Sequence, residues 1–167
     1  PGEIEELVLE LPGRLGAVRQ LLLEDERQQI EVDTSGRFRL RVRRLEYDGR
    51  DAVDLPVRTE DMAPYLAPSL YIQTEAERIQ TLAHRLRGRE RNAWKVALRL
   101  QQWVYDHMIP RNTNVRFKSS LEVLQDMEGT CSEYTVLFMA LCRAAGVPAR
   151  ACVGLLASAA GDLVLHI

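Results

Sequence analysis

Apolar and polar residues alternate with a period of two in the first third of the chain. Residues 37–43 are the clearest case, because arginines occupy the odd positions and Phe38, Leu40 and Val42 the even ones. Such a pattern predicts a strand with one apolar and one basic face. Residues 4–12 also alternate, and residues 15–25 favour a further strand over a short helix.

Turn signals lie on both sides of the arginine-rich strand. Ser35-Gly36 precedes it, and Asp48-Gly49 follows it as a dipeptide suited to a hairpin turn with positive φ. We therefore expect a β meander over residues 28–57. The segment 56–74 contains Pro56, Pro64 and Pro68, which exclude a long helix or a central strand.

The period changes to that of helices after this proline-rich connector. Apolar residues recur every three or four positions in residues 74–88, with Thr74 as the expected cap and Gly88 at the end. Residues 92–108 predict a second helix, capped by Asn92, whose apolar stripe contains Trp94, Ala97, Leu98 and Val104. A short helix with a serine cap is expected over residues 119–127. These patterns predict a β-rich module in residues 1–60, a connector in 61–73 and an α+β domain in 74–167.

Composition and charge limit the possible partners. The 167 residues are 46% hydrophobic, which is enough for one good core, and the net charge is −2. A near-neutral chain gives no overall electrostatic case for nucleic acid or an anionic membrane surface. The alternating arginines are interpreted as the solvated face of an antiparallel sheet, because no aromatic residue shares that face to stack on bases. No apolar run reaches the ~18 residues of a membrane span, and the sequence leaves the compartment open.

Cys131 is the strongest candidate for chemistry. Thr130 and Glu133 match a capping box, which makes Cys131 the first residue of an apolar helix that Gly146 and Pro148 terminate. The positive end of the helix dipole favours a thiolate over a thiol at this position. A backbone N–H there could also stabilise the oxyanion of an attacked carbonyl. The alternative is a small buried hydrophobic residue, which we expect for Cys142 and Cys152.

Cysteine catalysis needs a nearby base, which is normally histidine. His84 lies inside a predicted helix, and His107 near the end of another can interact with the helix dipole. His166 is the preferred base, because residues 149–167 predict a strand, a turn at 159–162 and a returning strand that carries it. Short paired spacings of zinc ligands are absent, so we expect no metal ion and no other cofactor.

The block from residue 119 to residue 155, with Trp103-Val104 before it and a histidine after it, resembles the transglutaminase-like superfamily and in particular its bacterial members. The matching positions are Leu121 to Leu124, Gly129, Cys131, Glu133, Arg143-Ala144, Gly146 to Arg150, and Gly154. The resemblance covers residues 74–167. It implies a papain-like fold of helices packed on an antiparallel sheet, with Cys131 as nucleophile and His166 as base.

The sequence departs from this family after the histidine. Members usually follow it with a small residue and Trp, and they carry an orienting Asp on the next strand, whereas Ile167 is the last residue here. We therefore expect the chain to be a fragment, truncated within the domain at its C-terminus and weakly active or inactive as it stands.

Three functions remain open from the sequence. The first is a thiol enzyme that hydrolyses or transfers the acyl group of a peptide or protein amide through an acyl-enzyme. The second is a non-catalytic module that binds peptides or partner proteins, with the strand Arg37 to Arg43 as one candidate surface. The third, an arylamine acetyltransferase, resembles the cysteine region less well.

Overall fold

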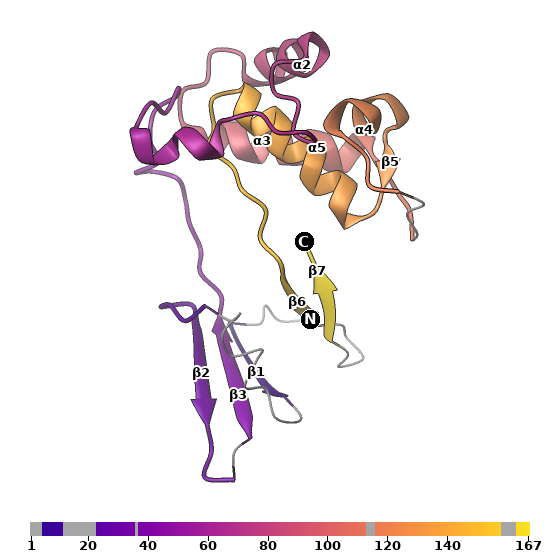
Figure 1. The fold of residues 1–167 in the computed structure, drawn as a ribbon. Helices are drawn as coiled ribbons and strands as arrows, with labels where there is room; N and C mark the ends of the chain where they lie inside the picture. Colours follow the sequence, from indigo (N-terminus) through magenta and orange to yellow (C-terminus); the bar gives the residue numbers. More distant parts are fainter. Residues whose placement is uncertain (1–4, 12–22, 36, 113–115, 158–162) are drawn as a thin grey trace. The chain divides into compact units, whose positions relative to one another are not determined.

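The computed structural model describes residues 5–11, 23–35, 37–112, 116–157 and 163–167 (Figure 1). The chain divides into two compact units, residues 1–48 and residues 49–167. Helices and antiparallel strands are both present, so the predicted α+β class is confirmed. The division into a module, a connector and a domain at residues 60 and 73 stays a prediction.

The first unit contains a three-stranded antiparallel sheet in the order β1-β3-β2. Its strands are β1 (Glu6–Leu11), β2 (Gln28–Val32) and β3 (Phe38–Arg43). Leu40 of β3 pairs with Leu9 on one side and Ile30 on the other, which places apolar residues on one face. Leu40 is 4% exposed and is the most buried residue of these strands among those whose burial is described.

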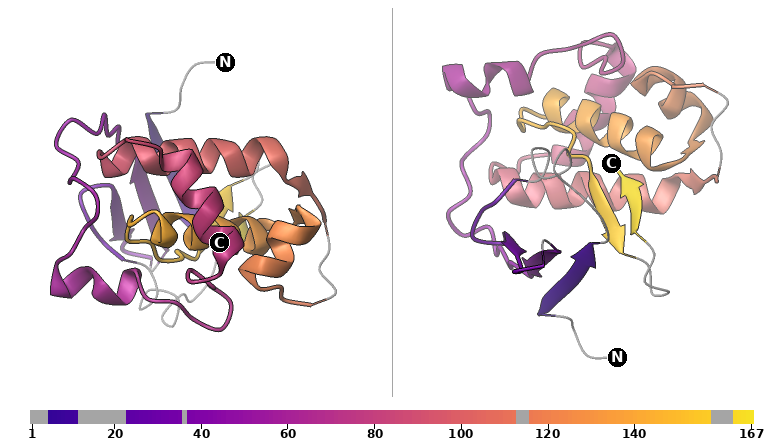
Figure 2. Two further views of the ribbon diagram at one scale, coloured as in Figure 1. Left: turned by 90° about the horizontal axis from the view of Figure 1, so that it is seen from above. Right: turned by 60° about the horizontal axis from the view of Figure 1, so that its bottom comes forward.

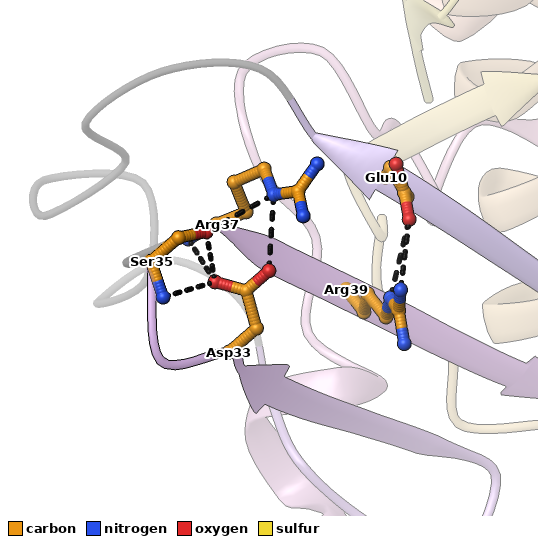
Figure 3. A network of polar contacts seen from close by, with 5 residues as sticks. All are labelled: Glu10, Asp33, Ser35, Arg37 and Arg39. Atoms are coloured by element: carbon orange, nitrogen blue, oxygen red, sulfur yellow. Dashed lines mark hydrogen bonds and ion pairs between the residues drawn. The ribbon is translucent and has the colours of Figure 1, made fainter.

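The arginines of β3 lie on the opposite face and are matched by glutamates. Arg39 pairs with Glu10 at 3.0 Å, as Figure 3 shows, and Arg41 lies between Glu6 and Glu31. Arg43 pairs with Glu6 at 3.1 Å. The prediction of a solvated sheet face is therefore confirmed. Because the guanidinium groups have carboxylate partners, this face is not an unbalanced basic surface for a partner.

The turn between β2 and β3 is organised by Asp33. Its Oδ1 accepts hydrogen bonds from the backbone N–H and hydroxyl of Ser35 and from the backbone N–H of Arg37 (Figure 3). Hydrogen bonds from Ser35 and Arg37 hold the pKa of Asp33 well below its ordinary range. This turn lies where Ser35-Gly36 predicts one, although Gly36 itself lies outside the described residues.

The hairpin predicted at Asp48-Gly49 is wrong. Gly49 does have a positive φ of 72°, but no strand follows it, and the described residues 44–57 contain a single bridge between Asp54 and Asn92. A Cβ on Gly49 would lie 2.2 Å from Cδ1 of Trp94. The glycine therefore permits close packing against a helix rather than a hairpin. The strand expected over 15–25 lies mostly outside the described residues, and its described end, 23–25, is not a strand.

The second unit is built around α5 (Cys131–Ala144), which packs against α2 (Glu77–Arg87), α3 (Ala93–His107) and α4 (Ser120–Asp126) (Figures 1 and 2). A short 3₁₀ helix, η1 (Glu60–Tyr65), lies in the proline-rich segment. The buried apolar residues of the four longer helices form one core, which includes Ile79, Leu82, Val96, Leu100, Val104, Val123, Val136, Leu137, Ala140 and Leu141.

Most predicted helix ends are confirmed. The Asn92 side chain accepts from the backbone N–H of Lys95, and Ser119 forms a capping box with Glu122. Gly88 and Gly146 end α2 and α5 with positive φ. The cap predicted at Thr74 is wrong, because α2 begins later, after Ala76.

The apolar stripe predicted for α3 is partly wrong. The buried residues are Ala93, Val96, Leu100 and Val104, whereas Leu98 is 44% exposed. A spacing of three or four residues fits more than one register of a helix, and packing against α5 selects the register that contains Val96 and Leu100.

Two strand pairs complete the second unit. β4 (Ile109–Pro110) pairs in parallel with β5 (Glu128–Gly129), and β6 (Gly154–Ala157) pairs antiparallel with β7 (Leu163–His166). The two strands predicted near residue 167 are thus confirmed, while the turn predicted at 159–162 lies outside the described residues. None of the described helices is long and apolar enough to cross a membrane.

Candidate active site

Cys131 is the first residue of α5, as the capping pattern predicts. Thr130 is the N-cap residue, and its backbone N–H and hydroxyl donate to Oε2 of Glu133 at 2.8 and 3.0 Å. The Thr130 side chain accepts in return from the backbone N–H of Glu133. These reciprocal bonds fix the start of the helix, so the position of the sulfur relative to the helix axis is well defined.

Gly129 makes this arrangement possible. A Cβ at this position would lie 2.2 Å from Cβ of Glu133 and 2.9 Å from its Oε2. Glu133 is 1% exposed, so its side chain has no room to move away. The residue before the N-cap must therefore be glycine for the capping carboxylate to remain in place.

The end of α3 is held beside the start of α5. The backbone N–H of Arg111 donates to the carbonyl of Gly129 at 2.8 Å, and the hydroxyl of Tyr134 donates to the carbonyl of Met108 at 2.8 Å. Arg111 also pairs with Glu128 through its side chain. The loop 111–118 therefore begins beside Gly129, two residues before Cys131 in the sequence, and its residues 113–115 lie outside the described ranges.

The three cysteines have different environments. Cys131 is partly exposed, Cys142 is buried and Cys152 is exposed. Burial raises the pKa of Cys142 to about 12, which keeps this thiol protonated and unreactive. The expectation of a buried residue is confirmed for Cys142 and is wrong for Cys152, because the chain at 151–153 has left the helical core and has not yet entered β6.

His166 is the last residue of β7 and is exposed. It pairs with Gly154 of β6. Within the described ranges, the side chains of Cys131 and His166 have no hydrogen bond to each other. Their pairing as nucleophile and base, which the sequence predicts, therefore stays a prediction.

The hairpin that carries His166 and the helix face behind Cys131 both expose apolar residues. Leu155 and Leu156 are neighbours on β6 that point to opposite faces, and they are 40% and 54% exposed. On the helices, a groove of about 180 Å³ is lined by Gln101, Val104, Tyr105, Tyr134, Thr135 and Phe138. Thr135 and Phe138 lie one and two turns after Cys131 on the same side of α5.

The other two histidines lie on helix surfaces. His84 is exposed on α2, and His107 occupies the last turn of α3, where Nδ1 lies 2.8 Å from the carbonyl oxygen of Trp103. Among the described residues, no cluster of three or more His, Cys, Asp or Glu side chains could hold a metal ion.

The comparisons with known proteins agree with this architecture. The model of the transglutaminase-like superfamily matches residues 80–164, so the chain belongs to this superfamily. The match includes α3, α4, α5, Cys131 and both strands of the last hairpin up to Val164. No curated protein matches the chain.

Two solved structures are similar. One is the crystal structure of a "putative cysteine protease" from Cytophaga hutchinsonii, with a TM-score of 0.60 and 23% identity over 98% of this chain and 60% of that one. The other is a "putative protease" from Parabacteroides distasonis, with a TM-score of 0.39 and 15% identity over 72% of this chain and 28% of that one. The chain thus spans about 60% of the length of the first protein, and this likeness supports the fold.

Proposed function

We propose that this protein acts on amide bonds through a cysteine nucleophile, with Cys131 as the attacking residue and His166 as the base. The observation that carries the proposal is the place of Cys131, which is the first residue of a helix with a complete capping box and is partly exposed. Cys142, eleven positions along the same helix, is buried and serves packing alone.

The first turn of α5 suits the chemistry. The N–H groups of the first residues of a helix have no acceptor within the helix, and together with the dipole they favour negative charge nearby. A thiolate at Cys131 would be stabilised there. The same N–H groups could donate to the oxyanion that forms when the sulfur attacks a carbonyl carbon.

The proposed reaction has two stages. His166 accepts the proton of the Cys131 thiol, and the sulfur bonds to the carbonyl carbon of the amide. The C–N bond then breaks, the amine leaves with the proton from the imidazolium, and a thioester remains on Cys131. In the second stage His166 takes a proton from water or from an amine, whose attack on the thioester carbon breaks the C–S bond and releases an acid or a new amide. The imidazolium then returns its proton to the sulfur of Cys131. Peptides and proteins are the proposed substrates, and hydrolysis is the preferred outcome.

Two apolar surfaces support the pairing of Cys131 with His166. The hairpin β6–β7 exposes Leu156 and Val164, and the face of α5 that begins at Cys131 carries Phe138, which is partly buried. Packing the hairpin on this face would bury both surfaces, and burial of apolar area favours such contact by about 25 cal/mol per Å². The end of β7 would then carry its imidazole towards the start of α5.

The test is covalent trapping with a peptide chloromethyl ketone, which alkylates an activated cysteine that lies in a peptide-binding site. Intact mass should increase by one adduct, and the adduct should be lost in Cys131→Ala and kept in Cys152→Ala. An adduct that moves to Cys152, or that forms equally without His166, would refute the enzymatic role. The remaining function would be a non-catalytic module that binds peptides or partner proteins.

A further inference from the structure

An open groove lies between α2, α3 and α4, and the patterns in the sequence do not predict it. Its volume is about 630 Å³. Leu82, Trp103, Leu124 and Met127 supply apolar surface, and the polar lining residues are Glu77, Arg78, Thr81, Arg85 and His107. Neither Cys131 nor His166 lines it, so it is a separate feature from the candidate active site.

The α3 side of the groove is a fixed aromatic surface. The rings of Trp103 and His107 are stacked, with centroids 4.5 Å apart and an angle of 20° between their planes. Nδ1 of His107 lies 2.8 Å from the carbonyl oxygen of Trp103, which holds the imidazole in this orientation. Arg99, one turn before Trp103, donates to the carbonyls of Leu86 and Arg87 and so attaches α3 to the end of α2. A ligand would meet a preformed wall, which lowers the entropic cost of binding.

The α2 side carries two arginines that form no ion pair within the described part of the chain. Arg78 and Arg85 are seven residues apart, so they lie two turns apart on one side of the helix. Both are exposed, and in the described ranges neither forms an ion pair. By contrast, Arg111 and Arg116, elsewhere in this unit, pair with Glu128 and Glu122.

Glu77 is the acidic side chain among the described residues that line the groove. It lies in the first turn of α2, where a carboxylate interacts favourably with the helix dipole. Two guanidinium groups against one carboxylate leave the rim positive. The groove therefore combines an apolar floor with a rim that attracts negative charge.

We propose that this groove binds an acidic peptide segment, with a large apolar side chain on Trp103 and flanking carboxylates on Arg78 and Arg85. Tryptophan and arginine are the residues that most often dominate peptide and protein interfaces. Guanidinium groups also bind carboxylates with two parallel hydrogen bonds. The apolar floor requires an apolar side chain on the ligand, and the positive rim favours negative charge beside it. The rim also disfavours a basic segment by like-charge repulsion.

The proposal is tested with three capped peptides of five residues in the chain with Cys131→Ala, which cannot form an acyl-enzyme. The first has leucine and phenylalanine among three aspartates, the second has lysines in place of the aspartates, and the third has serines in place of the two apolar residues. Isothermal titration calorimetry measures affinity, and tryptophan fluorescence, to which Trp94 and Trp103 both contribute, gives a second readout of binding. We expect saturable binding of the first peptide and at least tenfold weaker binding of the other two.

Matched variants separate the groove from general electrostatics. The double variant Arg78→Glu with Arg85→Glu should lower the affinity for the acidic peptide at least tenfold. It should also bind the lysine peptide more tightly than the acidic one. Arg89→Glu removes an exposed arginine that does not line the groove and should change affinity less than twofold. Thr81→Trp should fill the groove and block binding while the helical circular dichroism is retained.

The opposite results would overturn the proposal. One is the absence of saturable binding of the acidic peptide up to about 1 mM, the concentration that corresponds to a binding free energy near −4 kcal/mol. The others are equal binding of the serine peptide and an unchanged affinity in Arg78→Glu with Arg85→Glu. Because all measurements use Cys131→Ala, they do not depend on the proposed catalytic function, and either proposal can fail alone.

Discussion

Glu133 accepts two hydrogen bonds from Thr130, at 2.8 and 3.0 Å. Thr130 is the residue immediately before the candidate nucleophile, Cys131. The carboxylate is buried, and Gly129 packs directly against it. The start of α5 is therefore defined by contacts that do not involve Cys131 itself. This separation means that variants of the cap and variants of the cysteine test different parts of the account.

Removal of the capping hydroxyl should destabilise the protein. Thr130→Ala removes the side chain that bonds the backbone N–H of Glu133, and loss of an N-cap side chain typically costs about 1 kcal/mol. Thr130→Ser keeps the hydroxyl and should cost clearly less. Urea unfolding followed by circular dichroism measures both variants. Equal losses for the two variants would show that the methyl group, and not the cap, matters.

Gly129→Ala should reduce the stability of the protein more than Gly154→Ala does. At Gly129 the new Cβ would overlap Glu133, and overpacking of this kind costs about 1 to 3 kcal/mol. At Gly154 no described heavy atom beyond the two chain neighbours lies within 4 Å of the added Cβ, so Gly154→Ala should be close to neutral. Thermal unfolding of both variants makes the comparison. A Gly129→Ala protein as stable as the parent would contradict the close packing described for this site.

Glu122, the capping carboxylate of α4, should titrate at unusually low pH. The hydrogen bond from Arg116, followed by that from the backbone N–H of Ser119, lowers its pKa from 4.5 to about 2. Because the folded-state pKa is depressed, its stabilising contribution is complete above the unfolded-state value and is lost as pH falls towards 2. Nuclear magnetic resonance titration of the side-chain carboxyl measures this directly.

Arg116→Gln should raise the pKa of Glu122, because it removes the largest cause of the shift. Lys118→Gln serves as the control, since Lys118 pairs with Asp126 on the same short helix. An unchanged pKa in Arg116→Gln would show that the ion pair does not persist in solution.

Cys142 should resist alkylation as long as the protein is folded. Its side chain is 1% exposed, and burial raises its pKa to about 12. Iodoacetamide should therefore label Cys142 rapidly only in denaturant. In buffer its labelling should be slow, with a rate that follows global unfolding. Peptide mass mapping distinguishes it from Cys131 and Cys152. Rapid labelling of Cys142 without denaturant would mean that α5 is not packed as described.

The helical half of the fold follows largely from local sequence signals. Asn92, Ser119, Thr130 and Gly146 mark helix ends through side-chain hydrogen bonds or positive φ, and each acts within a few residues of its own position. The place of Cys131 at the start of α5 could be predicted for the same reason.

Features that depend on contacts distant in sequence could not be predicted. The Asp48-Gly49 dipeptide predicts a hairpin, but the positive φ of Gly49 serves close packing against Trp94, which lies 45 positions further along. The exposure of Leu98 depends on which face of α3 packs against α5. The exposure of Cys152 depends on where the chain leaves the helical core and where β6 begins. The groove beside Trp103 arises from three helices together, so no single segment carries a signal for it.

The most direct test of the central claim is the rate of alkylation of Cys131 relative to that of Cys152 at neutral pH. Cys152 is exposed and outside any helix start, so it reports the reactivity of an ordinary accessible thiol. If the start of α5 and His166 activate Cys131, iodoacetamide should label it at least tenfold faster than Cys152, and His166→Ala should remove most of this advantage. Equal rates for the two cysteines, with no effect of His166→Ala, would contradict the assignment of Cys131 as a nucleophile.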